Sequence, residues 1–439
     1  MSYKECMKSE LDLFSNSLIQ SNILKTEEVA YKPIASLDNS TVLEFISLGH
    51  GDTYRDLSSI YLRLKVQLIK LKDGKEELYE KGGTPVGLVN NVMHSLFRQC
   101  TIQLNGKPIA QTDHNYQYRA YIENLLNYGS NTAKTHLESV GWYLDENEMD
   151  IIENGKPEDS NSGYIKRSKL LAGSSVVEFM GKVHGDILNQ DKLLINGVDL
   201  RVIFSLEKPE FYLYSKEDSN SPRIKIIEAT MYMNHVTISP SILLAHENVL
   251  QRSNAIYPYK RVEVKTYTLP ANTFSLSLDN VVIGQLPNLI VFGMVDNDAY
   301  TGKRTKNSYN FKHNNLVRFN LSVNGVQIPN QPLEFDFSDE KPISTRGYLT
   351  LFKGTGIHYS DRGHQISKQF FDNGAFLLAF DLTPDNSYNT TCGSLLNQGT
   401  IRIEGRFRDS LKKSVTCIVY AEYDGSIEVD KARNVYTSF

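Results

Sequence analysis

The segment from His358 to His364 (HYSDRGH) has residue types that can bind a metal ion. It places two histidines and Asp361 in one glycine-containing stretch. Zinc takes four ligands in a defined geometry, and neither cysteine nor glutamate flanks these residues. We therefore interpret the segment as an ordinary polar loop and predict no metal ligands there.

A second segment, Asp296-Asn297-Asp298, has the opening pattern of a calcium-binding loop. Such a loop needs glycine at its sixth position and glutamate at its twelfth, whereas Thr301 and Asn307 stand there. The pattern favours a solvated turn. The segment Lys353-Gly354-Thr355-Gly356 similarly lacks the glycine spacing of a phosphate loop, and we expect it to end a helix.

A cluster of carboxylates follows the single tryptophan of the chain. The cluster consists of Asp145, Glu146, Glu148 and Asp150, and Trp142 precedes it. A hydrolase would hold two such carboxylates in a rigid cleft, where the tryptophan could stack on a sugar. The surrounding residues 145–161 are acidic and poor in apolar side chains, which favours an exposed loop that Trp142 anchors by its own burial.

A basic segment with interleaved aromatic residues is the candidate for contact with nucleic acid. Its members are Lys303, Arg304, Lys306 and Lys312, with Tyr300, Tyr309 and Phe311 among them. The whole chain has a net charge of -4, so one basic patch is weak evidence for such a contact. A charged surface loop or a contact between subunits is the favoured interpretation.

The elements that would position these residues are predominantly β-strands. Short alternating apolar runs are separated by Gly, Asn, Asp and Ser, and aromatic residues are abundant, with 25 Tyr and 19 Phe among 439 residues. Cys6, Cys100, Cys392 and Cys417 show no paired metal spacing, so we expect reduced thiols in an intracellular compartment. Apolar runs fall short of the roughly 18 residues that a membrane span needs.

Four local patterns occur twice in the same order, which predicts a tandem duplication. Residues 96–109 form a hairpin around Asn105-Gly106, and residues 316–328 form another around Asn324-Gly325. The patterns that follow each hairpin are a helix (115–127 and 346–352), a strand (near Phe179 and at 376–380) and a strand after an Asn and Gly pair or near-pair (196–206 and 397–407). Gly347 and Gly354 are expected to shorten or fray the second helix.

Residues 239–254 separate the two copies and have the pattern of one short amphipathic helix. Ser239 suits the N-cap and Pro240 the first turn, while Ile242, Ala245, Val249 and Leu250 share one face. We expect this face to pack beneath both copies and to fix their relative angle. The predicted division is an N-terminal arm (1–35), a first jelly roll (36–238), a linker helix (239–255), a second jelly roll (256–428) and a C-terminal tail (429–439).

The predicted fold class is all-β, a tandem double jelly roll of two eight-stranded antiparallel sandwiches with short inserted helices. Two unrelated sandwiches or one large barrel are the alternatives. A short docking helix is expected within the arm, from the spacing of Leu11, Phe14 and Leu18.

Several sequence blocks resemble the major capsid protein of Maverick/Polinton elements and adintoviruses. These blocks are ELDLF at 10–14, VLEFISLGHGDTYRDL at 42–57, LFRQCTIQLNGKPI at 96–109 with YRAYIENLLNYG after it, and SPSILLAHENVL at 239–250. The resemblance implies the double jelly-roll lineage of adenovirus hexon and tailless membrane-containing phages. It also implies homotrimers that tile an icosahedral shell around double-stranded DNA, with a vertex protein and minor capsid proteins as partners.

We therefore expect a structural capsid subunit without catalysis, cofactor or metal, located in the virion and assembled inside the host cell, in the nucleus or the cytoplasm. The mildly acidic balance predicts only indirect contact with the packaged DNA. The alternatives are a carbohydrate-binding or carbohydrate-cleaving protein on a two-sandwich scaffold, and a cell-surface adhesion module.

Overall fold

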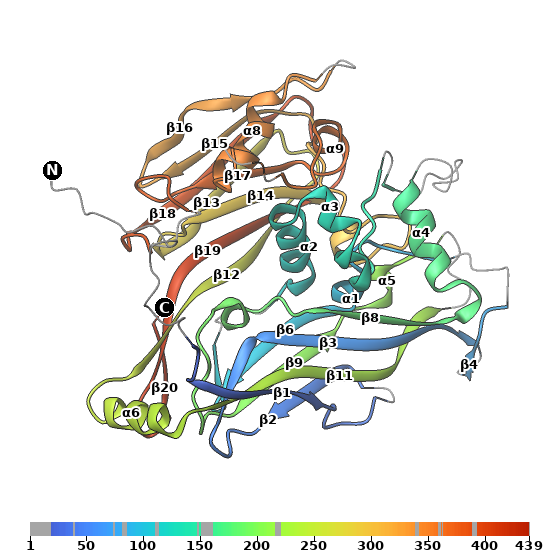
Figure 1. Ribbon diagram of the computed structural model, residues 1–439. Helices are drawn as coiled ribbons and strands as arrows, with labels where there is room; N and C mark the ends of the chain where they lie inside the picture. Colours follow the sequence, from blue (N-terminus) through green and yellow to red (C-terminus); the bar gives the residue numbers. More distant parts are fainter. Residues whose placement is uncertain are drawn as a thin grey trace, which may run out of the picture.

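The computed structural model describes residues 19–37, 40–72, 75–80, 86–109, 114–146, 149–150, 161–215, 221–338, 342–358, 361, 363–388 and 393–438. Two β-sandwiches lie one above the other, and the chain passes from the lower to the upper through helix α6 (Pro240–Leu250) (Figure 1). Among the described residues, no strand before α6 pairs with a strand after it.

The first sandwich is built from residues before α6. Its strands are β1 (Ile23–Tyr31), β2 (Val42–Ser47), β3 (Thr53–Lys72), β4 (Lys75–Glu77), β5 (Val86–Leu88), β6 (Phe97–Leu104), β7 (Lys107–Pro108), β8 (Val176–Lys182), β9 (Leu200–Leu206), β10 (Leu213–Ser215) and β11 (Pro222–Ile238). Its helices are α1 (Val92–Ser95), α2 (Tyr116–Asn127), α3 (Ser130–Ala133), α4 (Ser162–Leu170) and α5 (Pro209–Tyr212), with short 3₁₀ turns η2 (His136–Val140), η4 (Ala172–Ser174) and η5 (Asp186–Asn189).

The second sandwich follows α6. Its strands are β12 (Ala255–Leu269), β13 (Ser275–Gln285), β14 (Leu289–Asp296), β15 (Leu316–Val323), β16 (Val326–Glu334), β17 (Leu377–Asp381), β18 (Gln398–Phe407), β19 (Val415–Val429) and β20 (Val435–Ser438). Its helices are α7 (Asn297–Thr301), α8 (Thr345–Gly354) and α9 (Lys368–Asn373). The almost wholly apolar run 289–295 forms the buried strand β14, as its composition predicts.

Both sandwiches have the same antiparallel strand order. In the first, a sheet with the order β1-β11-β3-β8 accompanies one with the order β2-β9-β6-β7; in the second, the orders are β12-β19-β14-β17 and β13-β18-β15-β16. In these orders β1 corresponds to β12, β2 to β13, and so on through the eight strands of each jelly roll. The predicted all-β tandem double jelly roll is confirmed, and short strands such as β4 and β20 add to these sheets.

The Asn-Gly turns show how closely the two copies agree. Asn105 and Gly106 have φ values of 48° and 76°, and Asn324 and Gly325 have values of 51° and 80°, as a two-residue hairpin turn with positive φ at both positions requires. Each asparagine also accepts a backbone hydrogen bond from the strand that pairs beside it. The Asn105 Oδ1 accepts from the Asp199 N–H at 2.6 Å, and the Asn324 Oδ1 accepts from the Thr400 N–H at 2.9 Å.

Part of the predicted N-terminal arm belongs to the first sandwich. Strand β1 pairs with β11 from Ile23 opposite Ile238 to Tyr31 opposite Met231. Most β1 side chains are exposed, so the strand lacks the alternation of apolar residues that identifies a half-buried strand in a sequence. The helix predicted from Leu11, Phe14 and Leu18 lies outside the described residues.

Helix α6 is where the prediction of burial is wrong. Its predicted apolar face is covered only at Leu250, while Ile242 is half-buried and Ala245 and Val249 are exposed. Polar contacts hold the helix instead: His246 Nδ1 shares a hydrogen bond of 2.9 Å with the Tyr54 hydroxyl. The apolar periodicity therefore predicted the helix correctly, but the helix is not packed between the two cores.

Candidate functional site: the contact between the two jelly rolls

Helix α2 lies between the two sandwiches (Figure 1). It follows the β6–β7 hairpin, and Tyr118, Tyr121 and Leu125 recur at helical spacing. All three are buried. Asn115 precedes the helix with a φ of 65°, a left-handed conformation that asparagine tolerates better than most residues. The predicted helix at 115–127 is thus confirmed, and it carries aromatic side chains toward the second jelly roll.

Tyrosine side chains from both jelly rolls form the centre of the contact. Tyr121 of α2 stacks on Tyr309 with ring centroids 4.1 Å apart and an angle of 2° between the planes. The Tyr118 hydroxyl donates to the Ser308 carbonyl at 2.9 Å, and the Tyr309 hydroxyl shares a hydrogen bond of 2.8 Å with the Ser95 hydroxyl. Burial raises the pKa of Tyr309, so its hydroxyl stays protonated and can serve as a donor.

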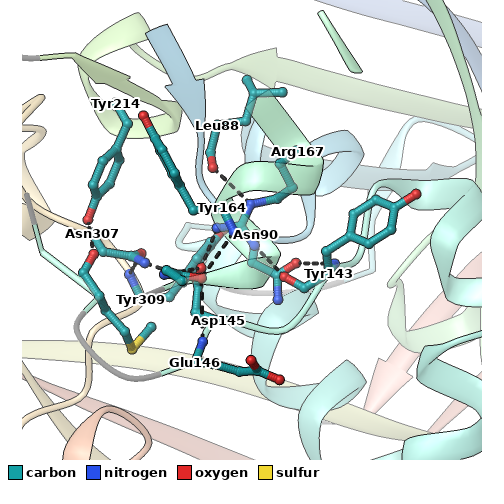
Figure 2. Close-up of polar contacts among 12 residues, drawn as sticks. Leu88, Asn90, Tyr143, Asp145, Glu146, Tyr164, Arg167, Tyr214, Asn307 and Tyr309 are labelled. Carbon is teal, nitrogen blue, oxygen red and sulfur yellow. Dashed lines mark hydrogen bonds and ion pairs between the residues drawn. The ribbon is translucent and has the colours of Figure 1, made fainter. Parts of the chain in front are cut away.

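A buried ion pair lies beside the tyrosines, and Figure 2 shows its partners. Asp145 binds the Arg167 guanidinium through Oδ1, and both side chains are only 1% exposed. The second carboxylate oxygen accepts from Asn307 Nδ2 at 3.0 Å. Arg167 Nε donates to the Leu88 carbonyl at 2.9 Å, so residues distant in the sequence satisfy both charges. Asn307 belongs to the second jelly roll and therefore ties it to the first.

A second charged group repeats this arrangement nearer the surface. Asp150 of the first jelly roll contacts Lys312 Nζ at 2.7 Å and Lys306 Nζ at 3.0 Å. Lys312 also contacts Asp296 at 2.9 Å. Burial by itself would raise the pKa of Asp150, but the charge of Lys312 and the hydrogen bonds from Lys312 and the Asn307 N–H hold that pKa below its usual value.

These contacts bear on two predictions. In the predicted exposed loop 145–161, Asp145 is buried and Asp150 contacts two lysines, so these two positions correct the prediction; residues 147–148 and 151–160 lie outside the described residues. The basic segment, for which a charged surface loop or a subunit contact was the favoured interpretation, makes ion pairs within the chain: Arg304 pairs with Glu210 at 3.0 Å, and Lys306 and Lys312 pair with Asp150. The interleaved Tyr309 and Phe311 are core residues with 0% exposure.

Trp142 is buried, as predicted, and it too connects the jelly rolls. Its Nε1–H donates to Gln365 Oε1 at 2.6 Å. The Gln365 Nε2 in turn donates to the Asn124 carbonyl of α2 at 2.8 Å. The indole is 0% exposed, so no face of it is open to stack on a sugar.

A groove with a volume of about 1280 Å³ runs between the jelly rolls next to α2. Its first wall includes Glu123 of α2, which contacts Arg119 Nε at 2.8 Å and His184 Nδ1 at 2.5 Å. Burial by itself would raise the pKa of Glu123, but the charge of Arg119 and the hydrogen bond from His184 lower it to about 2. This carboxylate is therefore ionised at neutral pH.

The second wall of the groove comes from β12, β19 and the residues before β18. Glu422 contacts Lys260 at 2.8 Å and accepts from the Tyr388 hydroxyl at 2.9 Å. Lys260 also lies 4.1 Å from the centroid of the Tyr388 ring. The Glu123–Arg119 and Glu422–Lys260 ion pairs thus each lie within one wall. Across the parts of the chain that the structure describes, no three His, Cys, Asp or Glu side chains are arranged to bind a metal ion.

The remaining sequence candidates are separated from this contact or serve the fold. His358 and Asp361 are exposed, whereas His364 is buried against Phe352 with ring centroids 4.2 Å apart; Tyr359, Ser360 and Arg362 lie outside the described residues. Asp296 directly precedes α7, makes no side-chain capping hydrogen bond to it, and binds Lys312. The segment 353–356 ends α8, as predicted.

Three residues of the contact were missed by the sequence analysis: Arg167, Asn307 and Gln365. Arg167 sits in α4, whose low apolar content gave no reason to expect a buried face. Asn307 was considered only because it stands where a calcium-binding loop would have a glutamate. A buried charged side chain needs a partner of opposite charge. Considering which basic residue could pair with a buried Asp145 would have pointed to Arg167.

Comparisons with known proteins were made for the whole chain. No protein-family model matches it. A Caenorhabditis elegans protein described as uncharacterized is 22% identical over 350 residues, which covers 79% of this chain and 80% of the relative. None of the described helices is long and apolar enough to cross a membrane.

Solved structures share the fold over nearly the full length. A chain of the Sputnik virophage structure determined by cryo-EM has a TM-score of 0.62 and 12% identity, covering 100% of this chain and 93% of that one. The Faustovirus major capsid protein has a TM-score of 0.53 and 10% identity, covering 94% and 92%. The mavirus major capsid protein has a TM-score of 0.51 and 12% identity, covering 100% and 96%. The chain therefore has the double jelly-roll fold found in these viral proteins.

Proposed function

We propose that this protein is the major capsid subunit of a DNA virus or virus-like mobile element, and that its role is structural rather than catalytic. The observation that carries the proposal is the fixed pairing of two jelly rolls with identical strand order. The full-length likeness to viral capsid proteins supports it.

The pairing of the jelly rolls explains how one chain can make a tile. Two similar lobes per chain give six lobes when three copies surround a threefold axis, and the outline is then nearly sixfold. Each contact between chains joins the first jelly roll of one copy to the second of the next, so the ring closes after three. The hydrogen bond from Asn307 to the buried Asp145 and the tyrosine stack hold the angle between the two jelly rolls within each chain.

The finer parts of the proposal rest on sequence resemblance. The blocks at 42–57, 96–109 and 239–250 support a relationship to Maverick/Polinton elements and adintoviruses. With that relationship come homotrimers that tile an icosahedral shell around double-stranded DNA, vertex and minor capsid proteins as partners, and a location in the virion after assembly in the nucleus or cytoplasm of the host. The net charge of -4 favours indirect contact with the DNA.

Sedimentation and negative-stain microscopy of the purified chain test the proposal. We expect a stable trimer with a near-hexagonal outline. A chain that remains monomeric at high concentration would overturn the proposal, and specific binding of that monomer to an oligosaccharide would favour the carbohydrate-binding alternative.

A further inference from the structure

The helix α8 holds the same place in the second jelly roll that α2 holds in the first. Each helix follows the hairpin with the Asn-Gly turn and precedes the last strand of the β1-β11-β3-β8 type of sheet. Residue by residue, Arg346, Tyr348 and Leu349 of α8 correspond to Arg119, Tyr121 and Ile122 of α2. Whatever covers α2 therefore indicates what could cover α8.

Within the chain, α2 is covered by the connection between β14 and β15. That connection, residues 297–315, supplies Tyr309, Asn307 and the lysines of the contact described above. Tyr118 and Tyr121 of α2 contact this connection directly, and Ile122 beside them is only 1% exposed. The contact joins apolar and aromatic side chains at its centre and charges of opposite sign at its edge.

The equivalent surface of α8 is open in the single chain. Leu349 is 55% exposed and Ile343, just before the helix, is 69% exposed. Arg346 and Lys353 are exposed on the same side of the helix, at positions 346, 349 and 353, which are neighbours at helical spacing. We call Ile343, Arg346, Leu349 and Lys353 the α8 surface; it is apolar at its centre and basic at its ends.

A matching surface lies in the connection between β3 and β6 of the first jelly roll, the topological equivalent of residues 297–315. Around the short strand β4, Leu78 is 56% exposed, and Glu76, Glu77 and Glu80 are exposed beside it. Glu76 forms ion pairs with Arg223 and Lys225, and Glu77 pairs with Lys70 at 3.5 Å. We call Glu76, Glu77, Leu78 and Glu80 the β4 surface; Leu78 is its apolar centre, and its glutamates lie among the basic residues Lys70, Lys75, Arg223 and Lys225.

We propose that the α8 surface binds the β4 surface of a second copy of this chain. The contact would repeat between chains the one that α2 and residues 297–315 make within a chain. Figure 1 shows α8 near the top of the second jelly roll and β4 at the far edge of the first, so one chain does not join the two surfaces itself. The inference rests on the proposed capsid function, which supplies the threefold ring that such a head-to-tail contact would close.

Cross-linking of introduced cysteines tests which surfaces meet. In a Cys6→Ser, Cys392→Ser background, Leu349→Cys and Leu78→Cys are made singly and together; the remaining Cys100 and Cys417 are buried. With a bis-maleimide reagent, we expect covalent dimers when the two single variants are mixed, covalent trimers from the double variant, and neither from a single variant alone. The control replaces Leu349→Cys by Ile283→Cys on β13, which is 71% exposed and should not cross-link to position 78.

The outcomes separate this inference from the proposed function. Trimers by sedimentation without a cross-link between positions 78 and 349 would overturn the inference and leave the capsid proposal standing. Monomers by sedimentation would overturn both.

A substitution on the α8 surface gives an independent readout. Leu349→Asp should abolish or strongly reduce the trimer and leave the circular-dichroism spectrum of the folded chain unchanged, because Leu349 is 55% exposed within its own chain. Leu349→Met should retain the trimer. A Leu349→Asp protein that still forms trimers as readily as the parent would overturn the inference.

Discussion

The helices α2 and α8 occupy equivalent places in the two jelly rolls, but they are packed differently. Ala120 of α2 is fully buried, and its counterpart in α8 is Gly347, where an added Cβ would lie 2.3 Å from the Phe335 ring. Helix α8 therefore packs tightly onto its own sandwich and keeps its other side exposed, whereas α2 is enclosed from both sides. The two copies of the fold thus keep the same topology, but the segments packed against each helix differ, so different helix faces are buried.

The largest expected effect on the free energy of unfolding comes from breaking a buried ion pair of the first jelly roll, compared with breaking an exposed ion pair of the second. Arg167→Met would leave the Asp145 charge buried and unpaired, which typically costs about 3–5 kcal/mol. Arg402→Met removes an exposed pair with Asp279, whose two side chains are 51% and 64% exposed, and should change stability little. Urea unfolding measures both. An equally small loss of unfolding free energy in the two variants would show that the buried Asp145–Arg167 pair does not stabilise the protein.

The two Asn-Gly turns should respond alike, because their geometry is the same. Gly106→Val and Gly325→Val each force a β-branched residue to positive φ, at a cost of about 1–3 kcal/mol. An added Cβ meets nothing within 4 Å at either glycine, so the loss comes from the backbone alone. Asparagine at the same positions should cost less. Unchanged melting of both valine variants would reject the turn geometry.

The difference between α2 and α8 predicts opposite preferences for alanine and glycine. Gly347→Ala should destabilise the chain, because overpacking costs about 1–3 kcal/mol, more than the gain of about 1 kcal/mol from alanine's helix propensity. The matched change Ala120→Gly should also destabilise, by loss of that propensity and of a buried methyl group. Thermal unfolding of both variants provides the measurement. A stabilised Gly347→Ala protein would contradict the close approach of α8 to Phe335.

The smallest effect concerns the acid range. Burial lowers the pKa of His364 to about 4 from its ordinary value of 6.5. The unfolded chain therefore takes up a proton that the folded chain refuses, so stability is full above pH 6.5 and falls as the pH drops toward 4. His364→Phe should reduce the difference in urea midpoint between about pH 7 and pH 4.5. His358→Phe is the exposed control, and an equal response of the two variants would exclude burial as the cause.

Much of the fold was predictable because its signals are local. The Asn-Gly turns, the alternation in β9 and β18 and the helical spacing in α2 each depend on neighbouring residues, and all appear where expected. The contact between lobes was not predictable in the same way. Asp145 and Asn307 are 162 residues apart. An acidic residue in a polar stretch is expected to be exposed unless its buried partner is known, and the sequence does not identify that partner. Tyr309 and Phe311 had the spacing of a stacking surface, yet a second lobe buries them.

The contact of Arg433 with the first jelly roll bears on the order in which the chain is made. The Arg433 carbonyl accepts a hydrogen bond of 2.7 Å from Asn105 Nδ2, across 328 positions of sequence, and Arg433 Nε donates to the Asn196 carbonyl at 2.9 Å. Synthesis at about 5–20 residues per second separates Asn105 from this partner by tens of seconds. Through that interval the ribosome still holds the chain, so the edge of the first lobe is completed only after most of the second lobe has been translated.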